Sequence, residues 1–341
     1  MAVVVVTGAS GLLGTNLLFA LRDAGHEVRA LFRSEASIAH IKADPRGAAI
    51  GWRKGDLDDA AALEQAFVGA DVVFHVAALV SILPTVTPAL VRANVDGTRN
   101  VLHAVRKAGV RRLVHTSSTV CVGLANSGGP DADEDATWNL REAGLADGYS
   151  ITKRESEELV MQAAAVQGAD AVDAVVVNPG YMFGPFDSKP SSGKLILDVA
   201  QGKVPGVTRG VNSFVDVRDV ARGMIAAWQQ GKRGQRYILA GHNLNYQDIL
   251  KRMAAAAGVK APSWNIPSPV AMLLGRAGDL QAAITGREPL LTSAAVRWAF
   301  CDRFRVSSTK AERELGYRIS PIEPAISDAL AFFRSSGKLR S

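Results

Sequence analysis

Hydrophobic and polar positions alternate in blocks that predict a repeating strand–helix pattern over the first half of the chain. The four consecutive valines Val3 to Val6 form an apolar run, typical of a strand buried on both faces of a parallel sheet. Apolar positions from Leu13 to Leu21 then repeat with helical period, stop at Gly25 and lead to a second strand-like run. This rhythm indicates an α/β fold with a doubly wound parallel sheet.

Six strands are predicted in this half of the chain, at residues 3–7, 28–32, 49–54, 72–76, 112–116 and 174–178. Helices are predicted at 60–67, with Asp58 as N-cap, at 91–108 and from Tyr149 to residue 167. Proline, glycine and serine cluster from 179 to 193 and indicate a turn away from the repeating unit. Beyond it we expect a helix at 195–201, a strand at 214–217, a helix at 220–230 and a strand at 236–239, followed by mainly helical chain.

These elements predict two parts of unequal size. Residues 1–180 would form a doubly wound domain, to which residues 211–241 return. Residues 181–210 and 242–341 would form a smaller, mainly helical lobe for substrate. A chain of 341 residues with 48% hydrophobic content can bury both cores without disulfides.

Composition narrows the classes of protein to consider. Cys121 and Cys301 match no metal or redox spacing, and the six histidines include no pair at i, i+4, so we expect no disulfide and no metal site. No apolar run approaches the ~20 residues that span a bilayer, and Met1 to Val6 lacks a basic leader region, so we expect a cytoplasmic protein with no membrane partner. The net charge of +6 is scattered and lacks aromatic interleaving, which argues against nucleic-acid binding.

A glycine-rich turn follows the first strand, with the sequence Thr7-Gly8-Ala9-Ser10-Gly11-Leu12-Leu13-Gly14. Glycines at these positions permit a tight turn, close approach of the backbone to a pyrophosphate, and close packing of the helix on its strand. The free N–H groups and positive dipole end of the following helix would face the phosphates. The turn therefore predicts a dinucleotide site.

Tyr149 and Lys153 lie one helical turn apart and share a helix face. At ~4 Å and an effective dielectric constant of ~20, an ammonium group favours the phenolate by up to about 4 kcal/mol, or about three pKa units. We therefore expect Lys153 to lower the pKa of Tyr149 so that it acts as a general acid or base. Ser118 follows an apolar strand whose carboxyl end would line the ligand site, where its hydroxyl could polarise a carbonyl oxygen.

These motifs together resemble the extended short-chain dehydrogenases/reductases, and the resemblance covers nearly the whole chain. Its other matching segments are Gly55-Asp56-Leu57, His75-Val76-Ala77-Ala78, Asn94 to Asn100, Thr116-Ser117-Ser118 and Asn178-Pro179-Gly180. The resemblance implies a Rossmann-type fold, a nicotinamide cofactor and the catalytic set Ser118, Tyr149 and Lys153, with Lys153 also holding the nicotinamide ribose. It implies cofactor contacts from Thr7, Gly8, Ser10, Gly11, Leu12, Leu13, Gly14, Asp56, Leu57, Ala77, Ala78, Lys153 and Pro179. Asn94 and Asn100 are interpreted first as structural residues.

The end of the second strand bears on which nicotinamide cofactor binds. Enzymes that use NAD place a carboxylate there for the ribose hydroxyls, whereas Leu31-Phe32-Arg33-Ser34 offers an arginine. Arg33 could pair with a 2′-phosphate, so we favour NADP(H) over NAD(H). The competing interpretation is that Arg33 only solvates the turn.

The resemblance also bears on the substrate. The chain is most similar to the branch of the family that contains dihydroflavonol reductases and 3β-hydroxysteroid dehydrogenases, which implies reduction of a ketone or aldehyde, or oxidation of a secondary alcohol, on a largely apolar small molecule. Apolar candidates for the substrate side are Val80, Val120, Tyr181, Met182 and Phe183, which could instead be ordinary packing residues. The resemblance also implies a possible homodimer through the helices at 91–108 and 149–167.

Two other functions are compatible with this sequence. Nucleotide-sugar epimerases and dehydratases share the family, but the arginine that clamps a diphosphate is missing before Phe214, so Arg209 or Arg236 would have to replace it. A dehydratase would also need an acid beside Ser118, where Thr119 and Val120 follow instead. The other alternative is a regulator that senses NADP without catalysis, although such relatives typically lose the tyrosine–lysine pair.

Overall fold

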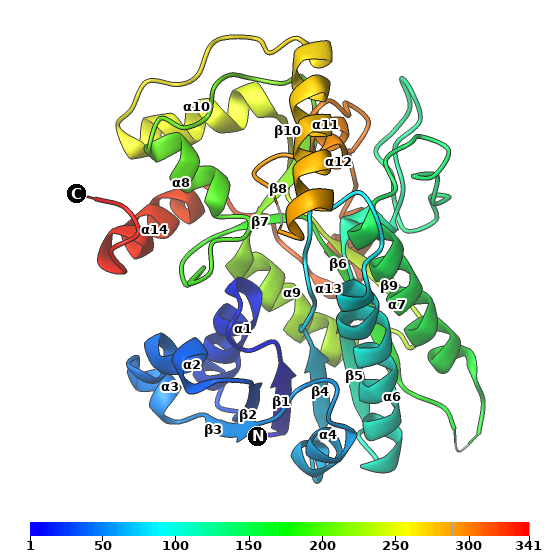
Figure 1. Cartoon of the computed structure of the whole chain (residues 1–341). Coiled ribbons are helices and arrows are strands. Elements are labelled where there is room, and N and C mark those ends of the chain that lie inside the picture. The colour runs from blue at the N-terminus through cyan, green and yellow to red at the C-terminus, as the bar shows by residue number, and fades with distance from the viewer. Residues whose placement is uncertain (169, 288, 341) are drawn as a thin grey trace.

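A parallel sheet of seven strands forms the centre of the larger part of the molecule (Figure 1). The computed structural model describes residues 1–168, 170–287 and 289–340. The strand order is β3-β2-β1-β4-β5-β6-β9. The strands are β1 Val3–Thr7, β2 Glu27–Phe32, β3 Gly51–Lys54, β4 Val72–His75, β5 Arg112–Thr116, β6 Ala174–Pro179 and β9 Arg236–Leu239. The predicted doubly wound sheet is confirmed, and the strand ends differ from the prediction by two residues at most.

Helices cover both faces of this sheet, as expected for strands that are apolar on both sides. Val4 and Val6 of β1 pack with the helices on one face: α1 Leu12–Asp23, α9 Val217–Gln230 and α13 Thr309–Leu315. Val5 packs towards the other face, which is covered by α4 Ala60–Phe67, α6 Gly97–Lys107 and α7 Gly148–Ala165. Two short helices, α2 Glu35–Lys42 and α3 Pro45–Ala48, flank the edge at β2 and β3 (Figure 1).

The helix predicted at 91–108 is not one regular helix. It begins with α5 Pro88–Leu90, continues as a π-helical turn over Val91–Asp96, and becomes regular only in α6. A π-helical turn such as this one is common at functional sites.

The N-cap predicted for α4 is also wrong. Asp59, not Asp58, caps that helix, because the Asp59 carboxylate accepts a 3.0 Å hydrogen bond from the amide of Ala62.

The smaller part of the molecule combines a three-stranded sheet with helices. The sheet has the order β10-β8-β7, and its strands are β7 Tyr181–Phe183, β8 Val211–Asp216 and β10 His242–Asn245. The strand predicted at 214–217 is thus β8, whereas β7 and β10 were not predicted. The helices are α8 Lys194–Ala200, α10 Tyr246–Ala257, α11 Ser268–Thr285, α12 Ser293–Ala299 and α14 Ile322–Ser335. Phe183 and Phe214 stack at 5.6 Å in the core that α8, α10 and α14 enclose.

The two parts meet at the carboxyl ends of the parallel strands (Figure 1). The chain passes from Pro179 of β6 to Tyr181 of β7 through Gly180 alone, and a Cβ on Gly180 would lie 2.6 Å from the Ser213 carbonyl oxygen. On the other side, the amide of Asn16 in α1 donates a 2.9 Å hydrogen bond to the Pro185 carbonyl. These contacts fix the smaller part against the glycine turn.

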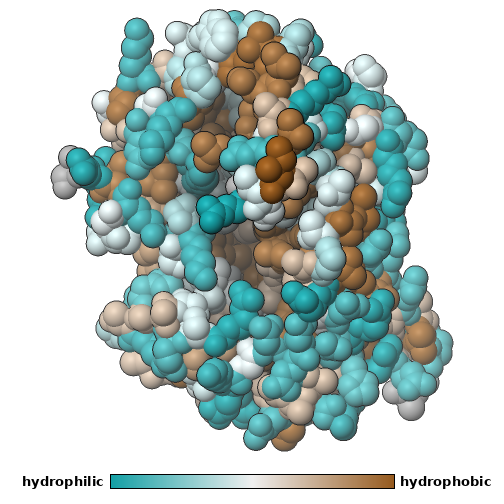
Figure 2. All heavy atoms as spheres, in the orientation of Figure 1, coloured by the Kyte–Doolittle hydropathy of each residue, from teal (hydrophilic) through white to brown (hydrophobic). Residues whose placement is uncertain are grey.

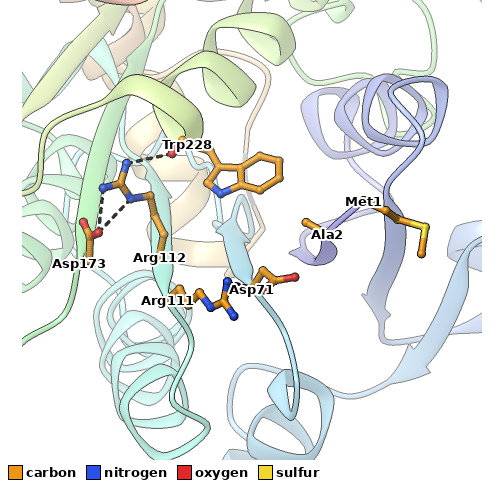
Figure 3. A pocket seen from close by; sticks show the side chains of 7 residues that line it. All are labelled: Met1, Ala2, Asp71, Arg111, Arg112, Asp173 and Trp228. Carbon is orange, nitrogen blue, oxygen red and sulfur yellow. Dashed lines mark hydrogen bonds and ion pairs between the residues drawn. The ribbon is translucent and has the colours of Figure 1, made fainter.

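A pocket of about 320 Å³ lies at the opposite, amino-terminal end of the strands (Figure 3). Its arginines are engaged within the protein: Arg112 binds Asp173 and the carbonyls of Trp228 and Gly231, and Arg111 pairs with Asp71. No candidate cofactor or catalytic residue lines this pocket.

Candidate active site

The glycine turn has the geometry that close approach of a pyrophosphate requires. Gly8 adopts a φ of +71°, and a Cβ there would lie 2.5 Å from the Ala77 nitrogen. A Cβ on Gly14 would lie 2.2 Å from the Gly8 carbonyl oxygen. Gly11 is the N-cap of α1 and provides no side chain to cap it, so the amides of its first turn stay available to a ligand. Thr7, Gly8, Ser10, Gly11, Leu12, Leu13 and Gly14 therefore form a continuous cradle that fits a dinucleotide.

The loops after β3 and β4 lie beside this cradle. Asp56 is exposed and its carboxylate accepts a 2.6 Å hydrogen bond from the amide of Leu57. Ala77 is half-buried, Ala78 is exposed, and the amide of Ala77 donates to the Thr7 hydroxyl at 3.3 Å. Asn94 and Asn100, interpreted from the sequence as structural residues, both hold these loops. The Asn100 side chain donates a hydrogen bond to the Leu57 carbonyl in the loop after β3.

Asn94, in the π-helical turn, connects the loop after β4 to helix α7, Gly148–Ala165. Its side chain binds both the amide and the carbonyl of Leu79, at 2.7 and 3.0 Å, and donates to the Thr152 hydroxyl at 3.1 Å. The structural interpretation of Asn94 is thereby confirmed. Its contact with Thr152, between Tyr149 and Lys153, was not predicted.

Arg33 lies at the carboxyl end of β2, where the adenosine end of a cofactor would lie if its pyrophosphate occupied the cradle. Its side chain is exposed, and no ion pair joins it to any residue in the described ranges. Lys54 is the last residue of the neighbouring strand β3 and lies opposite Phe32 in the register. Its side chain is also exposed, and it forms no ion pair with any described residue. Two uncompensated cations thus flank this position, of which sequence reasoning found only Arg33.

Helix α7 positions the predicted tyrosine and lysine. Asp147 caps it through a reciprocal capping box with Ser150, and the second carboxylate oxygen of Asp147 accepts from Trp298 at 2.8 Å. Tyr149 is half-buried in the first turn, whereas Lys153 is only 2% exposed. The Nζ of Lys153 donates a 2.7 Å hydrogen bond to the carbonyl of Thr116, the last residue of β5.

Ser118 lies two residues beyond β5, in extended backbone. It is half-buried, and its hydroxyl accepts a long 3.4 Å hydrogen bond from the amide of Val120. The Ser118 side chain also interacts with the phenol of Tyr149. Ser118, Tyr149 and Lys153 are therefore brought together at the carboxyl end of β5, although they come from two elements about 30 residues apart.

The expected lowering of the Tyr149 pKa by Lys153 is wrong for this structure. Burial raises the pKa of Tyr149 well above its ordinary value, while the Ser118 hydrogen bond opposes that shift only in part. Burial also lowers the pKa of Lys153, and the charge of Glu157 acts against that shift. The lysine faces the Thr116 carbonyl, so desolvation decides the state of the phenol and keeps it protonated at neutral pH.

A row of buried polar side chains crosses the sheet beneath the site. Thr7, His75 and His115 are opposite one another in β1, β4 and β5. His75 binds the hydroxyls of Thr7 and Thr98, at 2.9 and 3.1 Å, whereas both ring nitrogens of His115 lack a hydrogen-bond partner among the residues that the structure describes. Burial lowers the pKa of His75 to about 3 and that of His115 well below its usual range. Both rings are thus neutral near pH 7.

The residues predicted on the substrate side differ in exposure. Val80 is exposed, Val120, Tyr181 and Met182 are half-buried, and Phe183 is fully buried against Phe214. The molecular surface is hollowed near the centre of the face shown in Figure 2. Pro179, predicted as a cofactor contact, is buried at the end of β6.

Arg236 cannot act as a diphosphate clamp in this arrangement. Its guanidinium binds the Glu157 carboxylate at 3.1 Å and the carbonyls of Glu134 and Cys121. Arg209 is exposed immediately before β8. Of the two arginines considered for a clamp, only Arg209 stays available.

The sequence matches the model of the NAD dependent epimerase/dehydratase family over residues 4–240. The chain belongs to this family. It is 35% identical to a putative dihydroflavonol 4-reductase of Synechocystis, over 98% of this chain and 96% of the relative. It is 33% identical to a farnesyl-dihydroquinoline-oxide ketoreductase of Stigmatella aurantiaca, over 92% and 90% of the two chains.

Solved structures agree with this assignment. The crystal structure of gox2253 superposes with a TM-score of 0.82 at 32% identity, covering 100% of both chains. A nucleoside-diphosphate-sugar epimerase from Pseudomonas aeruginosa has a TM-score of 0.80 at 24% identity, covering 99% of both chains, which shows the shared fold alone. This member of the epimerase/dehydratase family is accordingly an extended short-chain dehydrogenase/reductase, an NAD(P)-dependent oxidoreductase that acts on CH–OH groups.

The described residues contain neither a cluster of metal-ligating side chains nor a helix suited to span a membrane. No group of three or more His, Cys, Asp and Glu side chains among them is arranged to hold a metal ion. No helix among them combines the length and the apolar content that crossing a bilayer requires.

Proposed function

We propose that this protein reduces a ketone or aldehyde, or oxidises the corresponding secondary alcohol, on a largely apolar small molecule with NADP(H). The observation that carries the proposal is the meeting of Ser118, Tyr149 and Lys153 at the carboxyl end of β5, beside a glycine cradle that fits a dinucleotide. When bound, the reduced nicotinamide supplies the hydride that reaches the carbonyl carbon.

The protein's own residues supply the other parts of the reduction. The Tyr149 phenol is protonated at neutral pH, so it can give its proton to the carbonyl oxygen. The Ser118 hydroxyl lies beside that phenol and can donate a hydrogen bond to the same oxygen as negative charge develops there. The Lys153 ammonium is held at the end of β5 by the Thr116 carbonyl and, once a cofactor is present, would hold its ribose.

The preference for NADP(H) rests on Arg33 and Lys54. Two exposed cations without ion-pair partners in the described chain make this end of the sheet attractive to a 2′-phosphate. A carboxylate in the position of Arg33 would instead have favoured the ribose hydroxyls of NAD.

The apolar character of the substrate is supported by the loop after β4. Leu79, Val80 and Val86 are exposed by 39%, 58% and 40%, in the same loop as Ala77, which contacts the glycine turn. The Thr292 hydroxyl binds the Ile82 carbonyl at 2.6 Å and joins this loop to the segment after α11. A ring or acyl chain would cover these exposed side chains better than a sugar diphosphate.

Epimerisation of a nucleotide sugar is the second candidate, because the fold accommodates it and Arg209 is exposed next to β8. The regulator that only senses NADP, considered from the sequence, has no observation in its favour, since Tyr149 and Lys153 are retained. The dimer surface expected on α6 and α7 stays a prediction.

One set of assays separates these functions. NADPH oxidation is followed with a panel of aromatic, alicyclic and aliphatic ketones, beside UDP-sugar turnover without net cofactor change. We expect turnover of apolar ketones, a loss of about 10²- to 10⁴-fold in kcat for Tyr149→Phe, and unchanged NADPH affinity in that variant. UDP-sugar turnover without ketone reduction would replace the proposal by the epimerase. Full activity of Tyr149→Phe would refute the assigned role.

A further inference from the structure

Glu157 is a buried carboxylate that no step of the proposed reaction uses. It lies on α7 one turn beyond Lys153 and is only 2% exposed. Its Oε2 accepts a 2.7 Å hydrogen bond from the side-chain amide of Asn178 in β6, and its Oε1 accepts one of 3.1 Å from Arg236 in β9. Buried carboxylates are costly unless they are paired, so this position calls for an explanation.

Asn178 connects Glu157 to the catalytic serine. The same Asn178 amide group that binds Glu157 also donates a 2.9 Å hydrogen bond to the main-chain carbonyl of Ser118. Asn178 is fully buried, and its side-chain oxygen Oδ1 has no hydrogen-bond partner within the described chain. Its orientation is thus set by the two acceptors, Glu157 and Ser118.

The cations around Glu157 also act on the turn that follows Ser118. Arg236 and Arg154 both donate to the Cys121 carbonyl, at 3.3 and 3.1 Å. Arg154 lies 3.7 Å from Glu157 and binds the exposed Glu158 at 2.7 Å. A single carboxylate therefore connects the helix that carries Tyr149 and Lys153 with the strand-end turn that carries Ser118.

We infer that Glu157 is a positioning residue of this active site: it holds Ser118 through Asn178 and keeps Lys153, one turn away on the same helix, in the ammonium form. The first role follows from the two hydrogen bonds of Asn178. The second follows from the placement of an anion beside a buried cation, since burial otherwise favours the neutral amine. The catalytic part of this inference rests on the proposed function, whereas the effect on the charge of Lys153 does not.

The groups that face Lys153 come from several elements. His75 on β4 and His115 on β5 are buried and neutral, the Cys121 thiol lies in the turn after β5, and Tyr149 lies one turn earlier on α7. Burial raises the pKa of the Cys121 thiol to about 12, so it also carries no charge near pH 7. Glu157 is consequently the nearby group able to stabilise the ammonium charge at neutral pH.

The first test needs neither cofactor nor substrate. The ε-carbon resonance of Lys153, assigned with Lys153→Arg, is titrated by NMR in the wild-type protein and in Glu157→Gln. We expect the pKa of Lys153 to fall by about one unit in Glu157→Gln, as for loss of a nearby opposite charge, and to stay unchanged in Glu158→Gln. Glu158 is the matched control, because it is the next residue on α7 but is exposed. Equal titrations of wild type and Glu157→Gln would overturn the inference whatever reaction the enzyme catalyses.

The second test uses the activity. We expect Glu157→Gln to lower kcat at least tenfold with little change in KM, and to move the alkaline limb of the pH–rate profile to lower pH. Because Glu157→Gln leaves the half-buried Arg236 without its carboxylate partner, Glu157→Gln/Arg236→Met serves as a second variant. The double variant should regain thermal stability but neither kcat nor the original alkaline limb.

The outcomes are distinct. Recovery of both kcat and the alkaline limb in the double variant would show that Glu157 only supports the fold and would overturn the inference. An unaltered kcat in Glu157→Gln would do the same. If the wild-type enzyme reduces no ketone at all, the proposed function fails, while the NMR titration still decides the effect of Glu157 on Lys153.

Discussion

The ammonium group of Lys153 lies 2.7 Å from the carbonyl oxygen of Thr116, at the point where β5 ends. The Lys153 side chain is only 2% exposed, so its charge is buried. The hydrogen bond to the Thr116 carbonyl compensates part of the free-energy cost of that burial. The contact also fixes the lysine beside the strand end that leads to Ser118. In this structure the lysine is therefore held by the sheet and not by the tyrosine one turn before it.

Replacement of Lys153 by methionine should separate stability from activity. Lys153→Met has nearly the same length and removes a buried charge, so we expect the free energy of unfolding to stay unchanged or to rise. Turnover should fall by about 10²-fold or more, because the ammonium that would hold the cofactor ribose in position is lost. Urea unfolding and kcat on the same preparation measure the two effects. A strong loss of stability together with normal turnover would contradict both expectations.

Arg33 should determine cofactor preference. A hydrogen bond between charged groups contributes about 1.5–3 kcal/mol, and 1.4 kcal/mol corresponds to a factor of about ten in Kd. We expect Arg33→Ala to raise the Kd of NADPH at least tenfold and to leave that of NADH nearly unchanged, with a smaller effect of the same kind for Lys54→Ala. Arg53→Ala is the matched control, since Arg53 is a neighbouring exposed cation on β3 whose guanidinium binds the Trp52 carbonyl. Equal affinity of the wild type for both cofactors would exclude the preference for NADPH.

Two glycines of the first turn should respond differently to alanine. Gly8→Ala places a Cβ 2.5 Å from the Ala77 nitrogen in a left-handed backbone, so it should strongly destabilise the fold. Gly11→Ala meets only the Gly8 carbonyl at 3.5 Å, an ordinary contact, so the melting temperature should change little while NADPH binding weakens at least tenfold.

Gly25→Ala provides the control for backbone strain in this comparison. Gly25 follows α1 with a φ of +80°, and a Cβ there has no neighbour within 4 Å. Its loss of stability should be about 1–2 kcal/mol, the cost of a left-handed alanine alone. Unfolding experiments on Gly8→Ala, Gly11→Ala and Gly25→Ala measure the change in stability, and NADPH titrations by fluorescence measure the change in cofactor affinity. Normal NADPH affinity in Gly11→Ala would argue against a pyrophosphate at this turn.

The parts of the fold that could be predicted are those encoded by local patterns. Val3 to Val6 are apolar on both faces, and this pattern alone distinguishes a buried parallel strand. The strand β10, from His242 to Asn245, has no such pattern, because it is half-buried and depends on pairing with β8. The close approach of Gly97 to Leu57 was also hidden, because a Cβ on Gly97 would come within 2.8 Å of Leu57, a residue 40 positions earlier in the chain.

The candidate site was predictable in its members but not in its electrostatics. The spacing of Tyr149 and Lys153 is local, whereas the raised pKa of Tyr149 depends on burial that distant segments create. Glu157 reads in sequence as one more acidic residue on a helix. Only the fold shows that Asn178 and Arg236 surround it.

The buried histidines should make stability fall with acidification. An unfolded chain protonates His75 and His115 below about pH 6.5. The folded protein keeps both neutral down to much lower pH, to about 3 for His75. The unfolded state thus binds more protons between pH 3 and 6.5, so each histidine lowers the free energy of unfolding by up to about 1.4 kcal/mol per pH unit as the pH falls through this window.

His115→Leu isolates the contribution of one ring. At pH 7.5 the variant should be at least as stable as the wild type, because it removes two buried nitrogens that have no hydrogen-bond partner in the described chain. Towards pH 4.5 its advantage should grow by about 1.4 kcal/mol per unit below pH 6, since it no longer has that proton to exclude. Urea unfolding at pH 4.5, 5.5, 6.5 and 7.5 measures both proteins, and parallel slopes for His115→Leu and wild type would show that His115 is already protonated in the folded enzyme.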